Sequence, residues 1–365
     1  MRPVSYWEYL RLEELLELQG GVERDEKALS NDETLFITVH QVFELWFKLI
    51  LRELRAARNL FTADPVAEQE LSGAVRNLKR AGAILRVATD HWEVMETLPT
   101  REFLAFRDKL LPASGFQSAQ MRQIEILLGL LDGDRASIGL EEGWKAALRG
   151  AGGANSPSLA RVEAELADRP TLKEAIDEWL HRTPIDGCEA QRADARERLD
   201  EFLAAFLAAH ARETDATAER AVSIAKSPGD AKSIRARYEA EKASVKTFFH
   251  PSEAEGGTRR ARIRAAMLFI ETYRELPLLA WPREVLDGLV ELEQLFVIFR
   301  QRHARMVERV IGRRTGTGGS SGVDYLDSTS KYRIFRDLWA IRTLQLRRAA
   351  APALKNAKFY DFRSS

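Results

Sequence analysis

Apolar residues recur at intervals of three and four along most of this chain. Between Thr34 and Ala57 one stripe is formed by Leu35, Val39, Val42, Trp46, Leu49 and Ile50, and an adjoining one by Phe36, His40, Phe43 and Phe47. This spacing predicts an amphipathic α-helix. Asn31 and Asp32 are candidates for its N-cap, and Glu33 in the first turn suits the positive end of the helix dipole.

Further segments show the same helical spacing: residues 71–96, 117–131, 194–246, 263–273 and 330–348. The third of these is rich in Ala, Arg, Glu and Lys, and Ser-Pro-Gly-Asp interrupts it at residues 227–230, which predicts an exposed helical pair. The alternation of apolar and polar residues that is typical of strands is nearly absent. The sequence therefore predicts an all-α fold.

We expect one helical domain overall, built from three consecutive segments. Residues 1–149 would form N-terminal helices with one part of the candidate site, and residues 150–260 a helical insertion at the periphery. Residues 261–365 would form C-terminal helices with the rest of the site. The first boundary coincides with the loop-like run Gly-Ala-Gly-Gly-Ala-Asn-Ser-Pro at residues 150–157.

Composition narrows the class of protein. Of the 365 residues 45% are hydrophobic, enough for a full core, and 55 Lys+Arg balance 55 Asp+Glu, so no net field favours nucleic acid. Cys188 is the only cysteine, which excludes an internal disulfide and any multi-cysteine metal site. The N-terminus has no signal-peptide core, and no apolar run approaches the roughly 20 residues that span a bilayer. We expect a cytoplasmic protein that binds neither nucleic acid nor membrane.

Two of the six histidines lie on helical faces that are otherwise apolar. His303 shares its stripe with Phe296, Phe299, Met306 and Val310, and His40 lies among Phe36, Phe43 and Phe47. Any single histidine is more often a hydrogen-bonded structural residue than a ligand. Two of them on separate apolar helices, with a polar loop after the second, suggest a buried haem with one protein ligand. The structural alternative stays open for both.

The loop after His303 combines glycines with hydroxyl side chains, Gly-Thr-Gly-Gly-Ser-Ser-Gly at residues 316–322. It does not match a nucleotide-binding loop, because it lacks the lysine of a Walker A motif and has Ser321 where the dinucleotide fingerprint needs its third glycine. A helix precedes it, not a strand. Thr317 can offer its hydroxyl to a zwitterionic ligand. A long flexible turn is the structural alternative.

Phe103, Arg107 and Leu110 share one helix face, because they are spaced i, i+4 and i+7. A guanidinium between two apolar side chains is costly unless it is paired. Asp108 points away from that face. A ligand carboxylate would pair with Arg107 through two parallel hydrogen bonds, and a salt bridge to another helix is the structural alternative.

Several motifs follow one another in a distinctive order. They are Tyr-Trp-Glu-Tyr-Leu at 6–10, Asp32-Glu33, Leu35-Phe36, His40-Gln41, Glu44-Leu-Trp46, Phe106-Arg107-Asp108, Pro-Ala-Ser-Gly-Phe-Gln-Ser at 112–118, Tyr273-Arg-Glu275 with Pro277, His303 with Met306-Val307, residues 316–322, and Ser328-Thr329. Together they resemble the haem-dependent tryptophan 2,3-dioxygenases. The resemblance covers nearly the whole chain except the middle, where it is faint.

The resemblance implies an activity and its cofactor. The activity is cleavage of the indole C2–C3 bond of L-tryptophan by O₂, which gives N-formyl-L-kynurenine, the first step of the kynurenine pathway. The cofactor is haem b, with His303 as the axial ligand of its iron. Ferrous haem would bind O₂ on the face opposite His303.

The resemblance also implies roles for the residues around the substrate. His40 would meet the indole N–H, Arg107 the carboxylate, and Thr317 the ammonium and carboxylate end. The indole would pack on Phe36, Phe103 and Leu110. Ser114 and Gly115 would line the haem edge, and Tyr6 and Tyr9 would come from a neighbouring subunit of a homotetramer.

Two departures from the family pattern lie near these residues. Trp7 stands where the family usually has glycine, and Phe299 where many members have tryptophan. One alternative is a related haem-dependent oxygenase that acts on a modified tryptophan or another indole. A second is a non-enzymatic haem-binding helical protein. The mass of the product distinguishes the dioxygenase from the first alternative. The presence of turnover distinguishes it from the second.

Overall fold

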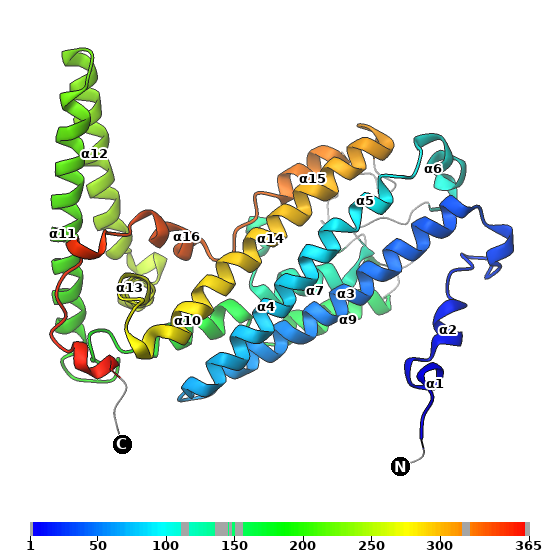
Figure 1. Cartoon of the computed structure of the whole chain (residues 1–365), viewed down its shortest axis with the longest axis horizontal. Coiled ribbons are helices and arrows are strands. Elements are labelled where there is room, and N and C mark those ends of the chain that lie inside the picture. Colours follow the sequence, from blue (N-terminus) through cyan, green and yellow to red (C-terminus); the bar gives the residue numbers. More distant parts are fainter. Residues whose placement is uncertain are drawn as a thin grey trace. The chain divides into compact units, whose positions relative to one another are not determined.

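The computed structural model describes residues 3–110, 117–135, 145, 148–149, 156–315 and 322–361. Within these ranges the only β-type pairing is an isolated bridge between Ile185 and Cys188, so the all-α prediction is confirmed. The α-helices (Figure 1) are α1 (Tyr6–Leu10), α2 (Leu12–Leu16), α3 (Asn31–Phe61), α4 (Glu68–Asp90), α5 (Trp92–Met95), α6 (Thr100–Arg107), α7 (Ala119–Leu128), α9 (Pro157–Ala167), α10 (Leu172–Arg182), α11 (Ala195–Ser223), α12 (Pro228–Phe249), α13 (Gly257–Thr272), α14 (Ala280–Ile311), α15 (Val323–Thr329) and α16 (Arg336–Thr343).

Helix ends depend on hydroxyl caps and glycine. At the start of α3 the hydroxyl of Ser30 accepts from the backbone N–H of Glu33 at 3.1 Å, so Ser30 is the cap and the predicted Asn31 and Asp32 lie within the first turn. The helix predicted over residues 117–131 is the shorter α7, which ends at Gly129 with a φ of 105°. A residue with left-handed backbone conformation at that position ends the helix.

The chain forms two compact units. The first contains residues 1–55, 79–169 and 292–333, and the second contains residues 56–78, 170–291 and 334–365. The boundaries fall within α3, α4 and α14. The three consecutive segments expected from the sequence stay a prediction.

In the first unit the long helices α3, α4 and α14 form the framework (Figure 1). Gly82 of α4 allows Leu295 of α14 to approach closely, since a Cβ at that glycine would lie 3.2 Å from the leucine side chain. Helices α7, α9 and α15 share a smaller core around Ala119, Ile126, Leu148, Leu159, Val162 and Tyr325. This unit contains both candidate histidines.

In the second unit the predicted helical pair is confirmed as α11 and α12, which pack against each other along their length. Lys242 of α12 donates to Asp215 of α11 at 2.6 Å. Within α12 only Val245 and Phe249 are buried. The last helical segment, predicted over residues 330–348, is shorter than expected, because the chain leaves the helical conformation after Thr329 and α16 spans only Arg336–Thr343.

Helix α3 corrects the expectation that no segment of the chain is apolar enough to span a bilayer. By length and composition it could cross a membrane, although core helices of water-soluble proteins meet the same test. Only 28% of its most apolar stretch is buried within the chain. Its few charged side chains interrupt the apolar run without much lowering its mean hydropathy, so the stretch contains no uninterrupted apolar run of about 20 residues.

Candidate active site

His40 of α3 is held in one tautomer by its own helix. Its Nδ1 lies 2.7 Å from the carbonyl oxygen of Phe36. A carbonyl only accepts, so Nδ1 carries the proton and Nε2 is left with its lone pair. Burial lowers the pKa of His40, and the Phe36 hydrogen bond and the charge of Glu44 offset this only in part. At neutral pH Nε2 is therefore a hydrogen-bond acceptor.

The side chain of His40 is accessible to solvent although its pKa is lowered by burial. The two observations disagree on how buried the residue is. An imidazole ring that packs against the protein on one side and meets solvent on the other accounts for both the exposure and the lowered pKa. We therefore take His40 as a reachable side chain whose surroundings disfavour its charged form.

His303 of α14 lies against an indole. Its ring stacks on Trp92, the first residue of α5, with ring centroids 4.4 Å apart and planes at 2°. Burial, with a smaller contribution from the charge of His40, lowers the pKa of His303 to about 4. The ring is therefore neutral at physiological pH, which is the form in which imidazole binds a metal.

Aromatic rings connect the two histidines. Phe43 contacts His40 at a centroid distance of 6.4 Å and Trp92 at 4.2 Å. Phe299 contacts Phe43 at 6.0 Å and His303 at 6.5 Å. The two helices predicted from the sequence to carry the histidines thus meet across one apolar cluster.

Helix α6 brings a second group of aromatic rings to His40. Phe36 lies 4.1 Å from the His40 ring, 5.9 Å from Phe103 and 5.6 Å from Phe106, measured between centroids. Leu110 ends the short 3₁₀ turn that follows α6 and is partly buried. The predicted indole-packing residues Phe36 and Phe103 are therefore in contact with each other and beside the predicted partner of the indole N–H.

Arg107 ends α6 and reaches the start of the glycine-rich segment. Its Nη2 donates to the carbonyl oxygen of Thr315 at 2.6 Å. Its Nε is buried and meets no acceptor among the described residues. No carboxylate within the described ranges pairs with it, so the alternative of a cross-helix salt bridge is not observed there. A partly exposed guanidinium with one buried donor to spare is suited to an anionic ligand.

Two of the predicted site residues lie outside this cluster in the single chain, and three others lie outside the described part of the chain. Tyr6 and Tyr9 of α1 are 68% and 80% exposed in the single chain. Thr317, Ser114 and Gly115 lie outside the described residues. For these five positions the predicted roles stay predictions.

Sequence reasoning missed Trp92 and Phe106 as parts of this cluster. Neither belongs to a stripe that contains a histidine, and Trp92 begins a helix of only four residues. No helical periodicity can be read from so short an element. The indole of Trp92 also has a buried Nε1 that meets no acceptor among the described residues.

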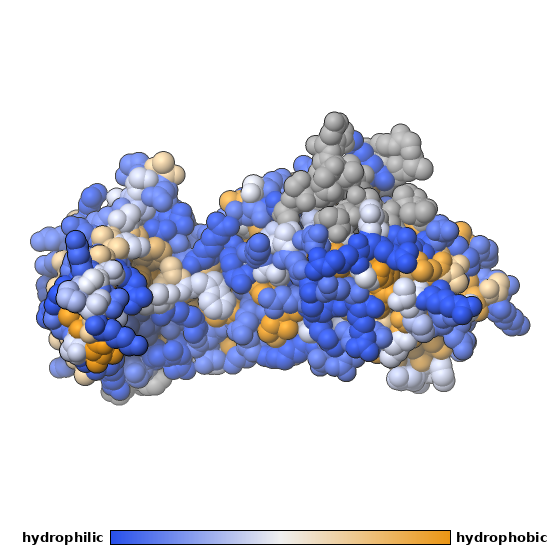
Figure 2. All heavy atoms as spheres, turned by 90° about the horizontal axis from the view of Figure 1, so that it is seen from above, coloured by the Kyte–Doolittle hydropathy of each residue, from blue (hydrophilic) through white to orange (hydrophobic). Residues whose placement is uncertain are grey.

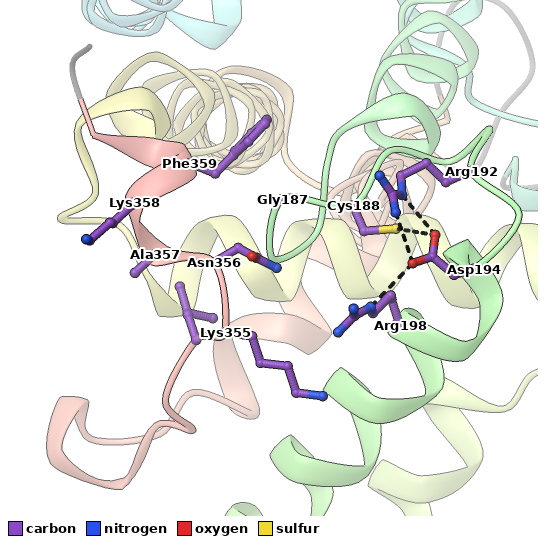
Figure 3. Close-up of a pocket in the computed structure, with 11 residues that line it drawn as sticks. Gly187, Cys188, Arg192, Asp194, Arg198, Lys355, Asn356, Ala357, Lys358 and Phe359 are labelled. Atoms are coloured by element: carbon purple, nitrogen blue, oxygen red, sulfur yellow. Dashed lines mark hydrogen bonds and ion pairs between the residues drawn. The ribbon is translucent and has the colours of Figure 1, made fainter. Parts of the chain in front are cut away.

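A separate cavity of about 680 Å³ lies in the second unit (Figure 3). Basic side chains line it, but Arg192 donates to Asp194 at 2.8 Å, Arg198 lies 3.5 Å from the same carboxylate, and Lys355 donates to Glu201 at 2.8 Å. None of the predicted site residues lines this cavity. We assign it no part in the chemistry of the histidines.

Fold and site together define an all-α protein with a half-buried neutral imidazole on one helix and an accessible imidazole on another. Within the described residues no three His, Cys, Asp or Glu side chains gather as a metal site. The neutral imidazole of His303 is a candidate for a single protein ligand. This is the class of site that the sequence suggested.

Comparison with known proteins identifies the family. A family model described as tryptophan 2,3-dioxygenase matches residues 1–345. Tryptophan 2,3-dioxygenase from Sorangium cellulosum is 52% identical over 99% of this chain and 88% of its own length. Tryptophan 2,3-dioxygenase 2 from Ralstonia nicotianae is 50% identical over 99% and 98%, and the Bdellovibrio bacteriovorus enzyme is 34% identical over 97% and 96%. The chain belongs to the tryptophan 2,3-dioxygenase family, whose members depend on haem.

Proposed function

We propose that this chain cleaves the indole C2–C3 bond of L-tryptophan with O₂ to give N-formyl-L-kynurenine. The observation that carries the proposal is the cluster itself. His40, with its accepting Nε2, faces the aromatic rings of α3 and α6, and the neutral His303 lies beyond Phe43. The family match over residues 1–345 includes every one of these residues.

The residues present fit haem b as the cofactor. His303 offers a neutral imidazole in a setting of Phe43, Trp92 and Phe299, which suits a flat apolar ring system. The buried Nε1 of Trp92 and Nε of Arg107 are donors without acceptors among the described residues, which suits ligands that bear carboxylates. When bound, the haem iron supplies the centre at which dioxygen is activated.

The protein's own residues position the substrate. Nε2 of His40 accepts the indole N–H, while Phe36 and Phe103 pack on the ring. Arg107 pairs with the amino-acid carboxylate through the donors that Thr315 does not use, and we propose that Thr317 meets the same end of the substrate. Fixing both ends of the molecule brings C2 and C3 of the indole to one place, which removes much of the entropic cost of reaction.

A related oxygenase that inserts one oxygen atom would use the same ligands, so the product decides between them. The purified protein is incubated with L-tryptophan and isotopically labelled dioxygen, and the product is weighed by mass spectrometry. Cleavage of the C2–C3 bond places both labelled atoms in one product. A product with a single labelled atom, or no product at all, would contradict the proposed function.

We further propose a homotetramer. Figure 2 shows that apolar surface gathers in patches among the hydrophilic side chains of the chain. In the first unit the exposed apolar residues include Leu45 and Leu49 of α3 and the aromatic side chains of α1. Neighbouring copies would cover these surfaces and would bring Tyr6 and Tyr9 to a pocket other than their own. Contact with neighbouring subunits would also account for the exposed apolar face of α3 without a membrane.

We also propose a cytoplasmic location. The single cysteine is buried and unpaired. A chain that uses no disulfide is suited to a reducing compartment. The balanced charge supports a small-molecule enzyme that binds neither nucleic acid nor membrane surfaces.

A further inference from the structure

A buried carboxylate lies close to the helix that carries His303. Glu125 of α7 is 3% exposed and meets three guanidinium groups. Arg122, on the same helix, donates to its Oε2 at 2.8 Å, and Arg300 of α14 donates to its Oε1 at 2.8 Å. Arg135, which follows the 3₁₀ turn Asp132–Asp134, donates to Oε2 as well. Both oxygens of the carboxylate are therefore used.

The charges of this cluster hold each other in place. Burial by itself would raise the pKa of Glu125, but Arg122, Arg300 and Arg135 lower it to about 2. Burial lowers the pKa of Arg300. At Arg122 burial also lowers the pKa, but Glu125, Tyr325 and Tyr332 together outweigh it and raise the pKa. Both arginines nevertheless remain cationic at neutral pH, because an ordinary guanidinium pKa is far above it.

Arg300 is bound on several sides. Besides Glu125, it donates to the carbonyl oxygen of Thr329 at 3.3 Å, the last residue of α15. Its guanidinium also lies 4.6 Å from the ring centroid of Tyr332. One side chain of α14 thus joins α7, the end of α15 and the segment after it. A planar guanidinium with five donors is suited to such a junction, and an ammonium group is not.

His303 is one turn further along the same helix. Residues spaced i and i+3 are neighbours on a helix surface, so any shift of α14 at Arg300 is passed directly to the imidazole. On another side of this turn, Arg302 contacts Glu96, the C-cap residue of α5, at 3.0 Å. Helix α5 carries Trp92, on which His303 stacks. The turn of α14 from Arg300 to His303 is therefore held by ion pairs to both α7 and the end of α5.

We propose that Arg300, through its buried pair with Glu125, is a positioning residue that fixes the depth and rotation of the His303 imidazole. This inference rests on the proposed function, in which His303 is the axial ligand. Residues that orient a ligand without touching the metal commonly change affinity or activity by roughly 10- to 100-fold when they are replaced. Arg300 touches neither the substrate residues of α6 nor His40.

The test compares Arg300→Met with wild type and with Arg309→Met. Methionine keeps the length of the side chain but removes the guanidinium, and Glu125 still has Arg122 and Arg135, so we expect the variant to fold. Arg309 is on the same helix but 68% exposed, with a single ion pair at 3.6 Å to Glu96. The readouts are the iron–imidazole stretching band of the ferrous protein by resonance Raman spectroscopy, and kcat and KM for L-tryptophan.

We expect Arg300→Met to shift or broaden the band and to lower kcat about tenfold or more, with KM within about twofold because the substrate contacts are on other elements. Arg309→Met should match wild type. An unchanged band and kcat in Arg300→Met overturn the proposal, as does a loss confined to KM. If Arg300→Met does not fold, Arg300→Lys is read in the same way. Absence of the band from the wild type would overturn the proposed function, and this inference with it.

Discussion

The tautomer of His40 decides what that residue can do. Because Nδ1 donates to the carbonyl of Phe36, Nε2 is free to accept the indole N–H. An indole N–H is a very weak acid, so a neutral imidazole orients it without needing to remove its proton. The contribution of His40 is therefore alignment of the indole.

Replacing His40 with Ala tests this role. We expect haem content to remain and kcat/KM for L-tryptophan to fall about a hundredfold, because the indole loses the acceptor that Nε2 provides. With 1-methyl-L-tryptophan, which has no N–H to donate, the same substitution should change kcat/KM much less. Steady-state assays of both substrates on both proteins measure the difference. An equal loss for both substrates would contradict an accepting role for Nε2.

Arg107→Lys tests the carboxylate contact. Lysine keeps the charge and can still donate to Thr315, but it cannot form two parallel bonds to a carboxylate. We expect kcat/KM for L-tryptophan to fall at least about tenfold, equivalent to about 1.4 kcal/mol. Tryptamine, which has no carboxylate, should change little. If both substrates lose equally, Arg107 serves the contact with Thr315 and not the substrate.

At this scale the sequence was informative wherever a residue belonged to a stripe or a motif. His40, His303, Phe36, Phe103 and Arg107 could all be singled out. The structure places the first four within one cluster of rings, and Arg107 at the end of the helix that carries Phe103. Their catalytic roles stay predictions. Trp92 could not be found, because a residue in a four-residue helix after a break has no periodic neighbours. Its stacking on His303 depends on contact between two segments that are distant in sequence. The spacing of apolar residues within one segment does not predict such a contact.

At the scale of elements, the buried charge cluster around Glu125 holds helices α7 and α14 together. The pKa of its carboxyl is lowered from an ordinary 4.5 to about 2. A group whose pKa is lower in the folded state contributes stability above its unfolded pKa, and that contribution is lost as the pH falls towards its folded pKa. A difference of this size corresponds to about 3 kcal/mol.

Glu125→Gln should therefore destabilise the protein by about 3–5 kcal/mol at neutral pH, since it leaves buried guanidinium groups without their carboxylate. Between about pH 5 and pH 2 the variant should also lose less stability than wild type, because the titrating group is gone. Urea unfolding at several pH values measures both effects. Glu219→Gln is the control, with a side chain 68% exposed. Parallel pH profiles for wild type and Glu125→Gln would contradict this account.

Helices were easier to predict than their ends. The positions of α3 and α11 follow from apolar spacing, since each buries one stripe. The caps at Ser30 and Gly129 depend on local backbone geometry that several nearby residues could have supplied. The helical segment expected over residues 330–348 is reduced to α16 for a related reason: apolar spacing persists there although the chain turns after Thr329.

For the whole molecule, the main open surfaces of the first unit are the aromatic side chains of α1 and the apolar face of α3. Gln41 of α3 donates to the carbonyl oxygen of Leu18 at 2.8 Å and accepts from Gln19 at 2.6 Å. We call the residues that precede α3 the N-terminal arm. Its Leu18 and Gln19 are therefore attached next to His40, while Tyr6 and Tyr9 remain exposed. A neighbouring subunit is the partner we propose for them.

Deleting residues 1–12 should lower activity and weaken the oligomer together, because the arm would both cross to a neighbour and complete its pocket. Light scattering and tryptophan turnover are measured on the same sample at several protein concentrations. Ile224→Ser, which removes an apolar side chain that is 81% exposed at the end of α11, is the control and should alter neither. A fully active monomer after the deletion would rule out this assembly.

The visible absorption spectrum of the purified protein tests the central claim most directly, with and without the His303 imidazole. Wild type reconstituted with haem should show a ferrous spectrum of a single histidine ligand that changes when L-tryptophan is added. His303→Ala should lose stoichiometric haem or that spectrum, while His40→Ala keeps both. If His303→Ala retains full haem content and an unchanged ferrous spectrum, His303 is not the ligand and the account of this site is wrong.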